Sequence, residues 1–188
     1  MKNDVKSMLR EFQPALRFVS FFVGVYIGGN VLYGLYVALF SPGPDPATTW
    51  VTFQSAFLLT TFSEPVQAIA RMSEPIVLIT KQGKTILRVY EGCNGLNVMI
   101  VFISFVIAFD SGRKRILVFL LAGCVVVHVA NLGRIMLLFY TALYRPSFFY
   151  YFHKYLFTAI LYLVVIALWF IWIESDRRKS KNISHVTE

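Results

Sequence analysis

The apolar residues of this chain gather into long runs that are separated by short polar stretches. Runs over about residues 18–40, 116–143 and 155–173 are each long enough to cross a bilayer, which takes about 20 residues of helix. A further run over 94–109 is short, and it reaches spanning length only if the polar residues just before it also enter the membrane. The pattern predicts about four transmembrane helices.

Residues 41–92 follow a different pattern. Prolines in SPGPDPATT (41–49) end the first run, and the apolar stretch over 50–62 is too short to span, so we expect it to be interfacial or re-entrant. Residues 75–92 hold two β-type runs around a Lys-Gln-Gly-Lys turn, which predicts a small β-hairpin. The expected fold class is therefore an all-α integral membrane protein with an interfacial or re-entrant segment and a small extracytoplasmic β-hairpin.

The first apolar run is expected to be a retained anchor. It exceeds the core of a signal peptide and lacks a small-x-small cleavage site. Gly28, Gly29 and Gly34 within it would let a neighbouring helix approach closely.

Composition agrees with a membrane protein, because 57% of the 188 residues are hydrophobic and only 15% are charged. The net charge of +8 comes largely from basic residues beside the apolar runs, which indicates cytoplasmic flanks by the positive-inside rule rather than a nucleic-acid-binding surface. We expect a cytoplasmic N-terminus (1–17), one membrane-embedded domain (18–173) with an extracytoplasmic segment (41–92), and a basic cytoplasmic tail (174–188).

This topology brings three chemically notable residues to one depth. Cys93 begins the second span, within the polar, glycine-containing stretch YEGCNGLN, and therefore lies at the outer face. Arg134 is about 27 Å along the helix that starts at Ile116, at about 1.5 Å per residue, which is also close to the outer face. His153 stands just before the last span, again outside.

Each of these residues alone has a structural explanation. Arg134 can extend to the membrane interface, His153 can be an interfacial residue among aromatic neighbours, and Gly92 and Gly95 can mark only a helix entrance. Together, however, the three provide a nucleophile, a base and an oxyanion donor, which is the set that acyl transfer requires. We expect the polar stretch to keep the thiol hydrated enough to ionise. Glu91 works against thiolate formation, unless it orients His153 or Arg134 or faces water.

Cys124 is the second cysteine, and it is expected to be a small buried apolar residue. Helical depths place it more than twice too far from Cys93 for a disulfide, which requires Cα atoms within about 7 Å. The chain also lacks a C-x-x-C motif, which argues against a thiol redox protein. His128, near mid-membrane, is expected to be a packing histidine.

Three segments resemble the signatures of the exosortase/archaeosortase family, in the family's order: EGCNGLN, HVANLGRIMLLFY and FHKYLFTAILYLVV. The resemblance covers residues 85–173, and the short length is most similar to the exosortase F-like subgroup. It implies that Cys93 is the nucleophile, that Arg134 and His153 complete the catalytic set, and that Asn131 is the family's asparagine before the arginine. Relatives commonly have serine after the cysteine, where this chain has Asn94, whose amide can also donate a hydrogen bond.

The resemblance further implies a cysteine transpeptidase or peptidase of the bacterial cytoplasmic (inner) membrane, with its active site facing outward. Its protein substrates would carry a C-terminal sorting signal made of a motif, a transmembrane helix and a basic end, and an unidentified nucleophile would accept the product. Glu91, Asn94, Gly95 and Asn131 are the expected supporting residues, and we expect neither a cofactor nor a metal. The alternative is a non-catalytic membrane scaffold that binds anchored partners through small-residue helix faces.

Overall fold

The computed structural model describes residues 2–62, 65–109 and 113–184, and describes side chains over 12–62, 65–109 and 116–175. Residues 110–112, between the second and third apolar runs, and the end of the basic tail (185–188) lie outside the described residues. The elements, in chain order, are α1 (Lys2–Ala38), α2 (Pro46–Phe62), β1 (Val66–Arg71), β2 (Ile76–Lys81), β3 (Lys84–Tyr90), the 3₁₀ turn η1 (Glu91–Cys93), α3 (Leu96–Ala108), α4 (Arg113–Tyr144), the 3₁₀ turn η2 (Pro146–Phe148), α5 (Phe149–Tyr151), the π-helical segment η3 (Phe152–Leu156) and α6 (Phe157–Ser184).

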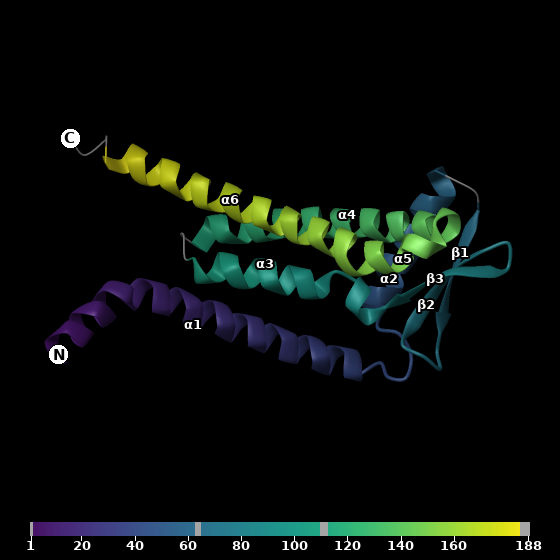
Figure 1. Ribbon diagram of the computed structural model, residues 1–188, viewed down its shortest axis with the longest axis horizontal. Helices are drawn as coiled ribbons and strands as arrows, with labels where there is room; N and C mark the ends of the chain where they lie inside the picture. Colours follow the sequence, from purple (N-terminus) through teal and green to yellow (C-terminus); the bar gives the residue numbers. More distant parts are fainter. Residues whose placement is uncertain (1, 63–64, 110–112, 185–188) are drawn as a thin grey trace.

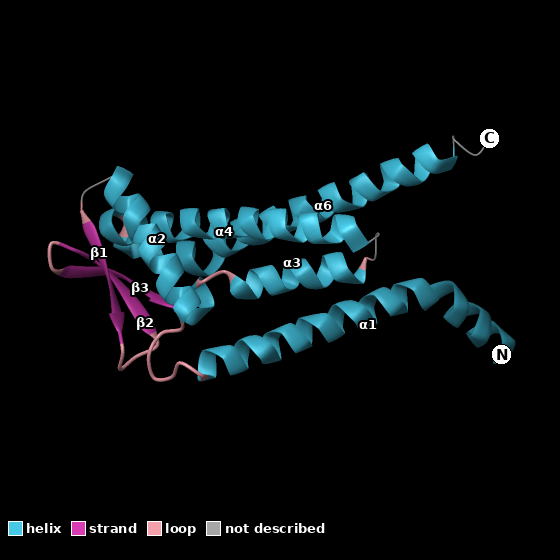
Figure 2. Cartoon of the chain, turned by 180° about the vertical axis from the view of Figure 1, so that it is seen from behind, coloured by secondary structure: helices cyan, strands magenta, loops and turns pink. Residues whose placement is uncertain are grey.

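The long helices run along the length of the molecule, and the small sheet closes one end (Figure 1). α2 lies at the sheet end, whereas α1 begins and α6 finishes at the opposite end (Figures 1 and 2). α3 packs against α1, α4 and α6, so it is the central helix of the bundle. The junction from β3 through η1 into α3 therefore connects the sheet to the interior of the bundle.

Three helical stretches are long and apolar enough to cross a membrane: Phe12–Ala38, Ile116–Tyr144 and Pro146–Ser175. Leu96–Ala108 is also apolar but shorter. The predicted class of a mainly helical membrane protein with a small sheet is confirmed. The expectation of about four spans rests on α3, which has 13 residues and is shorter than a bilayer-crossing helix.

The sheet is larger than the expected hairpin. β2 and β3 pair antiparallel around the predicted turn, and β1 adds a third strand on the other side of β2. β1 was not predicted because its sequence, VQAIAR, is short and has few residues with high β-strand propensity. The stretch predicted at 50–62 is the 17-residue helix α2, which begins earlier, at Pro46, and packs on the sheet.

Two apolar clusters hold the bundle together. One, at the sheet end, joins α2, the sheet and the end of α4, and it includes Cys93. The other lies along α3, α4 and α6, where Phe105 stacks on Trp169 with ring centroids 4.2 Å apart. Helices in a membrane associate through close packing, and Gly123 accordingly lies directly against the ring of Phe102.

Glycine also matters at one position in α1. A Cβ at Gly29 would lie 2.8 Å from Ile100 of α3, so a glycine is needed for the close approach of these helices. Gly28 and Gly34 face open space. The expected small-residue contact is therefore limited to Gly29.

The helical stretch that contains the last predicted span starts at Pro146, earlier than the predicted boundary at 155. Pro146 opens a 3₁₀ turn, α5 follows, and the helix widens to π geometry over Phe152–Leu156 before α6 begins. Such π segments are rare and often occur at functional sites. His153 lies within this one.

Candidate functional site

Cys93 ends the 3₁₀ turn that joins β3 to α3. Its side chain is buried, with 9% of the residue exposed, in the apolar cluster at the sheet end. The expectation of a hydrated thiol is therefore wrong for this structure, because Cys93 is packed in this cluster with residues of α4 and α6. A nucleophile in this position would have to be ionised by neighbouring groups rather than by water.

Asn131 connects α4 to the cysteine turn. Its Nδ2 donates a 2.9 Å hydrogen bond to the backbone carbonyl of Cys93, and the residue is fully buried. Gly95 permits this contact, because its φ of 86° is in the left-handed region and an added Cβ would lie 3.1 Å from Asn131 Cγ. The Oδ1 atom of Asn131 is buried and has no hydrogen-bond partner.

Arg134 lies one helical turn beyond Asn131 on α4, next to Ile135 of the apolar cluster at the sheet end. It is close enough to His153 for the two side chains to interact electrostatically. His153 stacks on Phe149, with ring centroids 5.7 Å apart, and Phe149 belongs to the residues packed around the cluster of Cys93. The structure thus brings Arg134 and His153 together, beside the cluster at the sheet end that contains Cys93.

This part of the molecule contains an unusual set of buried polar atoms without partners. They include Asn131 Oδ1, Arg134 Nε and His153 Nδ1. An unpaired buried polar atom costs about 1–3 kcal/mol, so several at one place need an explanation. A bound peptide, whose amides both donate and accept, would supply partners of the required kinds.

Asn94 has a supporting position behind the cysteine. Only 2% of it is exposed, and its Nδ2 donates to the hydroxyls of Tyr33 (3.0 Å) and Thr48 (3.2 Å). Its Oδ1 accepts the backbone N–H of Leu96 at 2.9 Å, at the start of α3. Tyr33 in turn donates to the carbonyl of Glu91 at 2.8 Å. Asn94 therefore ties α1, α2 and α3 together instead of pointing toward a substrate.

Glu91 lies beside a second carboxylate, Asp45, which is fully buried and caps α2 by accepting the N–H of Thr48. Burial, with a smaller contribution from the negative charge of Asp45, raises the pKa of Glu91 above its ordinary value. Within the described residues, no hydrogen bond or ion pair connects the Glu91 side chain to Arg134 or His153. The idea that Glu91 orients one of them gains no support.

The remaining candidates make contacts of their own. His128 shares a 2.8 Å hydrogen bond with Gln54 and stacks on Trp50, which agrees with a packing role. Cys124 packs at the margin of the cluster along α3, α4 and α6, and both cysteines are free thiols, as the depth argument predicted.

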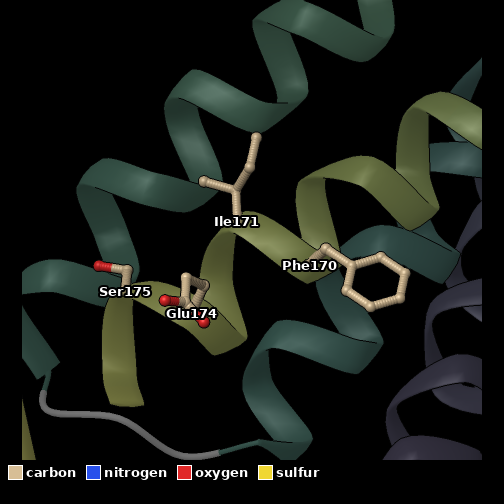
Figure 3. Close-up of a pocket in the computed structure, with 4 residues that line it drawn as sticks. All are labelled: Phe170, Ile171, Glu174 and Ser175. Carbon is tan, nitrogen blue, oxygen red and sulfur yellow. The ribbon is translucent and has the colours of Figure 1, made fainter. Parts of the chain in front are cut away.

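A surface hollow lies away from Cys93, and the described residues near Cys93 form no metal site. Over the described residues, no group of three or more His, Cys, Asp or Glu side chains could hold a metal ion. A cavity of about 620 Å³ is lined by four residues of α6, Phe170, Ile171, Glu174 and Ser175 (Figure 3). These residues lie on the part of α6 that runs away from the sheet, so the cavity is not part of the candidate site.

Sequence reasoning missed three residues of the hydrogen-bond network around Asn94: Tyr33, Asp45 and Thr48. Asp45 followed by Pro46 and Thr48 is a helix-start signature, an N-cap before proline, that could have predicted the start of α2. Tyr33 gave no such signal, since nothing in an apolar run distinguishes it from Tyr26 or Tyr36.

A family model described as transmembrane exosortase (Exosortase_EpsH) matches residues 15–171. No curated protein and no solved structure matches the chain. The match extends across α1 and α2 as well as the three segments that contain Cys93, Arg134 and His153, and it covers most of the sequence. The chain therefore belongs to the transmembrane exosortase family.

Proposed function

We propose that this protein is a membrane-embedded cysteine peptidase or transpeptidase that cleaves the C-terminal sorting signals of exported proteins and transfers them to an acceptor. One observation carries the proposal. Cys93 lies at the sheet end together with Arg134 and His153, amid buried polar atoms that lack partners. Family membership supports a sorting-related role in the membrane.

In the proposed first half-reaction, His153 takes the proton of the Cys93 thiol and the thiolate attacks the substrate carbonyl carbon. Arg134 donates to the oxygen that becomes negative as the C–S bond forms. The C–N bond then breaks, and His153 returns its proton to the leaving amine. The product is a thioester on Cys93, and the released fragment keeps the substrate's membrane helix.

In the second half-reaction, an acceptor amine or water attacks the thioester carbon. His153 takes a proton from the attacking group, the C–S bond breaks, and the thiolate of Cys93 is released and reprotonated. Transfer to an amine yields a new amide, whereas water yields a free carboxylate. Asn131 acts throughout as a positioning residue, because it holds the carbonyl of Cys93.

The proposed location is the bacterial cytoplasmic membrane, with both termini inside and the sheet end outside. One feature supports it. The basic residues near the start of α1, at the start of α4 and at the end of α6 lie at the end of the bundle opposite the sheet. The extended segment of an exported substrate would then meet the sheet end, where Cys93 lies.

The test uses a reporter protein fused to the C-terminal segment of a co-encoded protein that ends in a motif, one apolar helix and a basic tail. We expect co-expression with the wild-type protein to shorten the reporter, and mass spectrometry to identify the new C-terminus. Cys93→Ala should leave the reporter full-length, while the matched control Cys124→Ala should cut it normally. Equal processing by Cys93→Ala and wild type would refute the proposal and favour the scaffold.

A further inference from the structure

The strand β3 leads directly into the candidate nucleophile. It ends at Tyr90, and the 3₁₀ turn that follows ends at Cys93. A chain segment lying along the outer edge of β3 would therefore reach the cysteine within a few residues. The edge of this strand is the shortest backbone route from the sheet to the site.

The outer edge of β3 is unpaired. β3 pairs with β2 on one side, and in the part of the chain that the structure describes no other hydrogen bond uses the backbone of Lys84–Tyr90. The other edge strand differs, because Thr60 of α2 exchanges hydrogen bonds of 3.3 Å with both the N–H and the carbonyl of Val66 in β1. An open strand edge is a ready template for an extended peptide.

We propose that the outer edge of β3 binds the extended segment of the substrate that precedes its membrane helix, by backbone pairing. This inference rests on the proposed function, and it names the way in which the same site recognises its substrate. Backbone pairing supplies affinity without demanding one sequence, and the side chains on alternate positions supply selectivity.

The direction of the chain supports this occupant. β3, Cys93 and α3 follow one another in the order of extended strand, reactive residue and apolar helix. A sorting signal has the same order, an extended motif and then an apolar helix. A substrate strand parallel to β3 would enter the membrane in the same direction as α3, and would bring the peptide bonds after its paired stretch level with Cys93.

The positive charges on β3 disfavour one competing occupant, the β3 edge of a second copy of this protein. Lys84 and Arg88 are exposed on β3, so two such edges would place like charges opposite each other. A neutral or acidic peptide meets no such repulsion. The exposed cations therefore favour a substrate segment over self-association.

The sheet offers a matched pair of positions for a test. Ile69 on β1 and Arg88 on β3 are both cross-strand partners of Leu78, so they lie on one face of the sheet at its two opposite edges. Both are exposed. A cysteine in place of Arg88 therefore tests the edge of β3, and a cysteine in place of Ile69 tests the edge of β1.

The experiment introduces Arg88→Cys or Ile69→Cys into a Cys93→Ala, Cys124→Ala background that holds the reporter uncut. Single cysteines are placed along the reporter before its helix, and membranes are treated with copper–phenanthroline and air. Neighbouring paired strands lie about 4.7–4.9 Å apart, so side chains at matching positions are near enough for a disulfide after small adjustment. We expect Arg88→Cys to cross-link at alternate reporter positions, at about tenfold higher yield than Ile69→Cys.

A second variant reports the direction of pairing. Tyr90→Cys should shift the cross-links toward the reporter's helix if the strands are parallel. Equal yields from the two edges, or no alternation along the reporter, would overturn edge pairing. Separate processing by the wild-type protein distinguishes the failures: an uncut reporter refutes the proposed function, whereas a cut reporter without preferential Arg88→Cys cross-links refutes only this inference.

Discussion

Replacing Asn94 by alanine should destabilise the whole sheet end of the protein. The side chain makes three hydrogen bonds from a position that is 2% exposed, to Tyr33, Thr48 and the N–H of Leu96. Each such bond contributes about 0.5–1.5 kcal/mol net, so we expect Asn94→Ala to lower the free energy of unfolding by about 2–4 kcal/mol. Asn94→Ser, which introduces the residue common in relatives, keeps one hydroxyl and should lose less.

The free energy of unfolding is measured in mixed micelles by titration with a denaturing detergent, with tryptophan fluorescence as the signal. Asn97→Ala is the matched control, because Asn97 is an exposed asparagine three residues further on, in the first turn of α3. It should change the free energy of unfolding by less than about 0.5 kcal/mol. If Asn94→Ala unfolds like the wild type, or no more easily than Asn97→Ala, the network does not bind the three helices together as argued.

Three further predictions concern residues around Cys93. Gly95→Ala should cost about 1–2 kcal/mol of stability, measured by the same titration, because the backbone there is left-handed, whereas Gly92→Ala, which faces open space, should cost less. The pKa of Glu91 is raised in the folded state, so the folded protein binds the carboxyl proton more tightly than the unfolded chain does. The free energy of unfolding should therefore fall as the pH rises above about 4.5. Glu91→Gln should reduce this pH dependence, and the exposed control Glu74→Gln should not. Arg134→Lys keeps the charge but removes the buried Nε, and should slow reporter processing about 10²–10³-fold without reducing membrane insertion; unchanged processing would exclude the guanidinium from the reaction.

Much of the fold follows from hydropathy and topology. Apolar run length predicted the long helices, and helical rise predicted that Arg134 would lie near the end of α4 where Cys93 and His153 also lie. What sequence reasoning could not supply is the burial of Cys93. Burial depends on which side chains of α4 and α6 cover a turn, and that is a tertiary property with no local signal.

The same limit applies to the hydrogen bonds of Asn94. An asparagine followed by glycine at a helix entrance is typical of a turn, and this local pattern does not indicate distant partners. Its partners, Tyr33 and Thr48, are 61 and 46 residues away in the chain. The Asn94 side chain can join these elements by hydrogen bonds only because α1 and α2 lie close to the start of α3.

Helix α1 has a broader consequence through that tie. Its apolar stretch, Phe12–Ala38, has 27 residues, packs against α3 and leaves most of its side chains exposed on the surface of the molecule. At about 1.5 Å per residue this stretch is roughly 40 Å long, which exceeds a hydrocarbon thickness of about 30 Å and which a tilt of the helix would accommodate. A tilt that changed with lipid chain length would act through the Tyr33 hydroxyl on the carbonyl of Glu91, two residues before Cys93. Bilayer thickness would thereby be coupled to the position of Cys93.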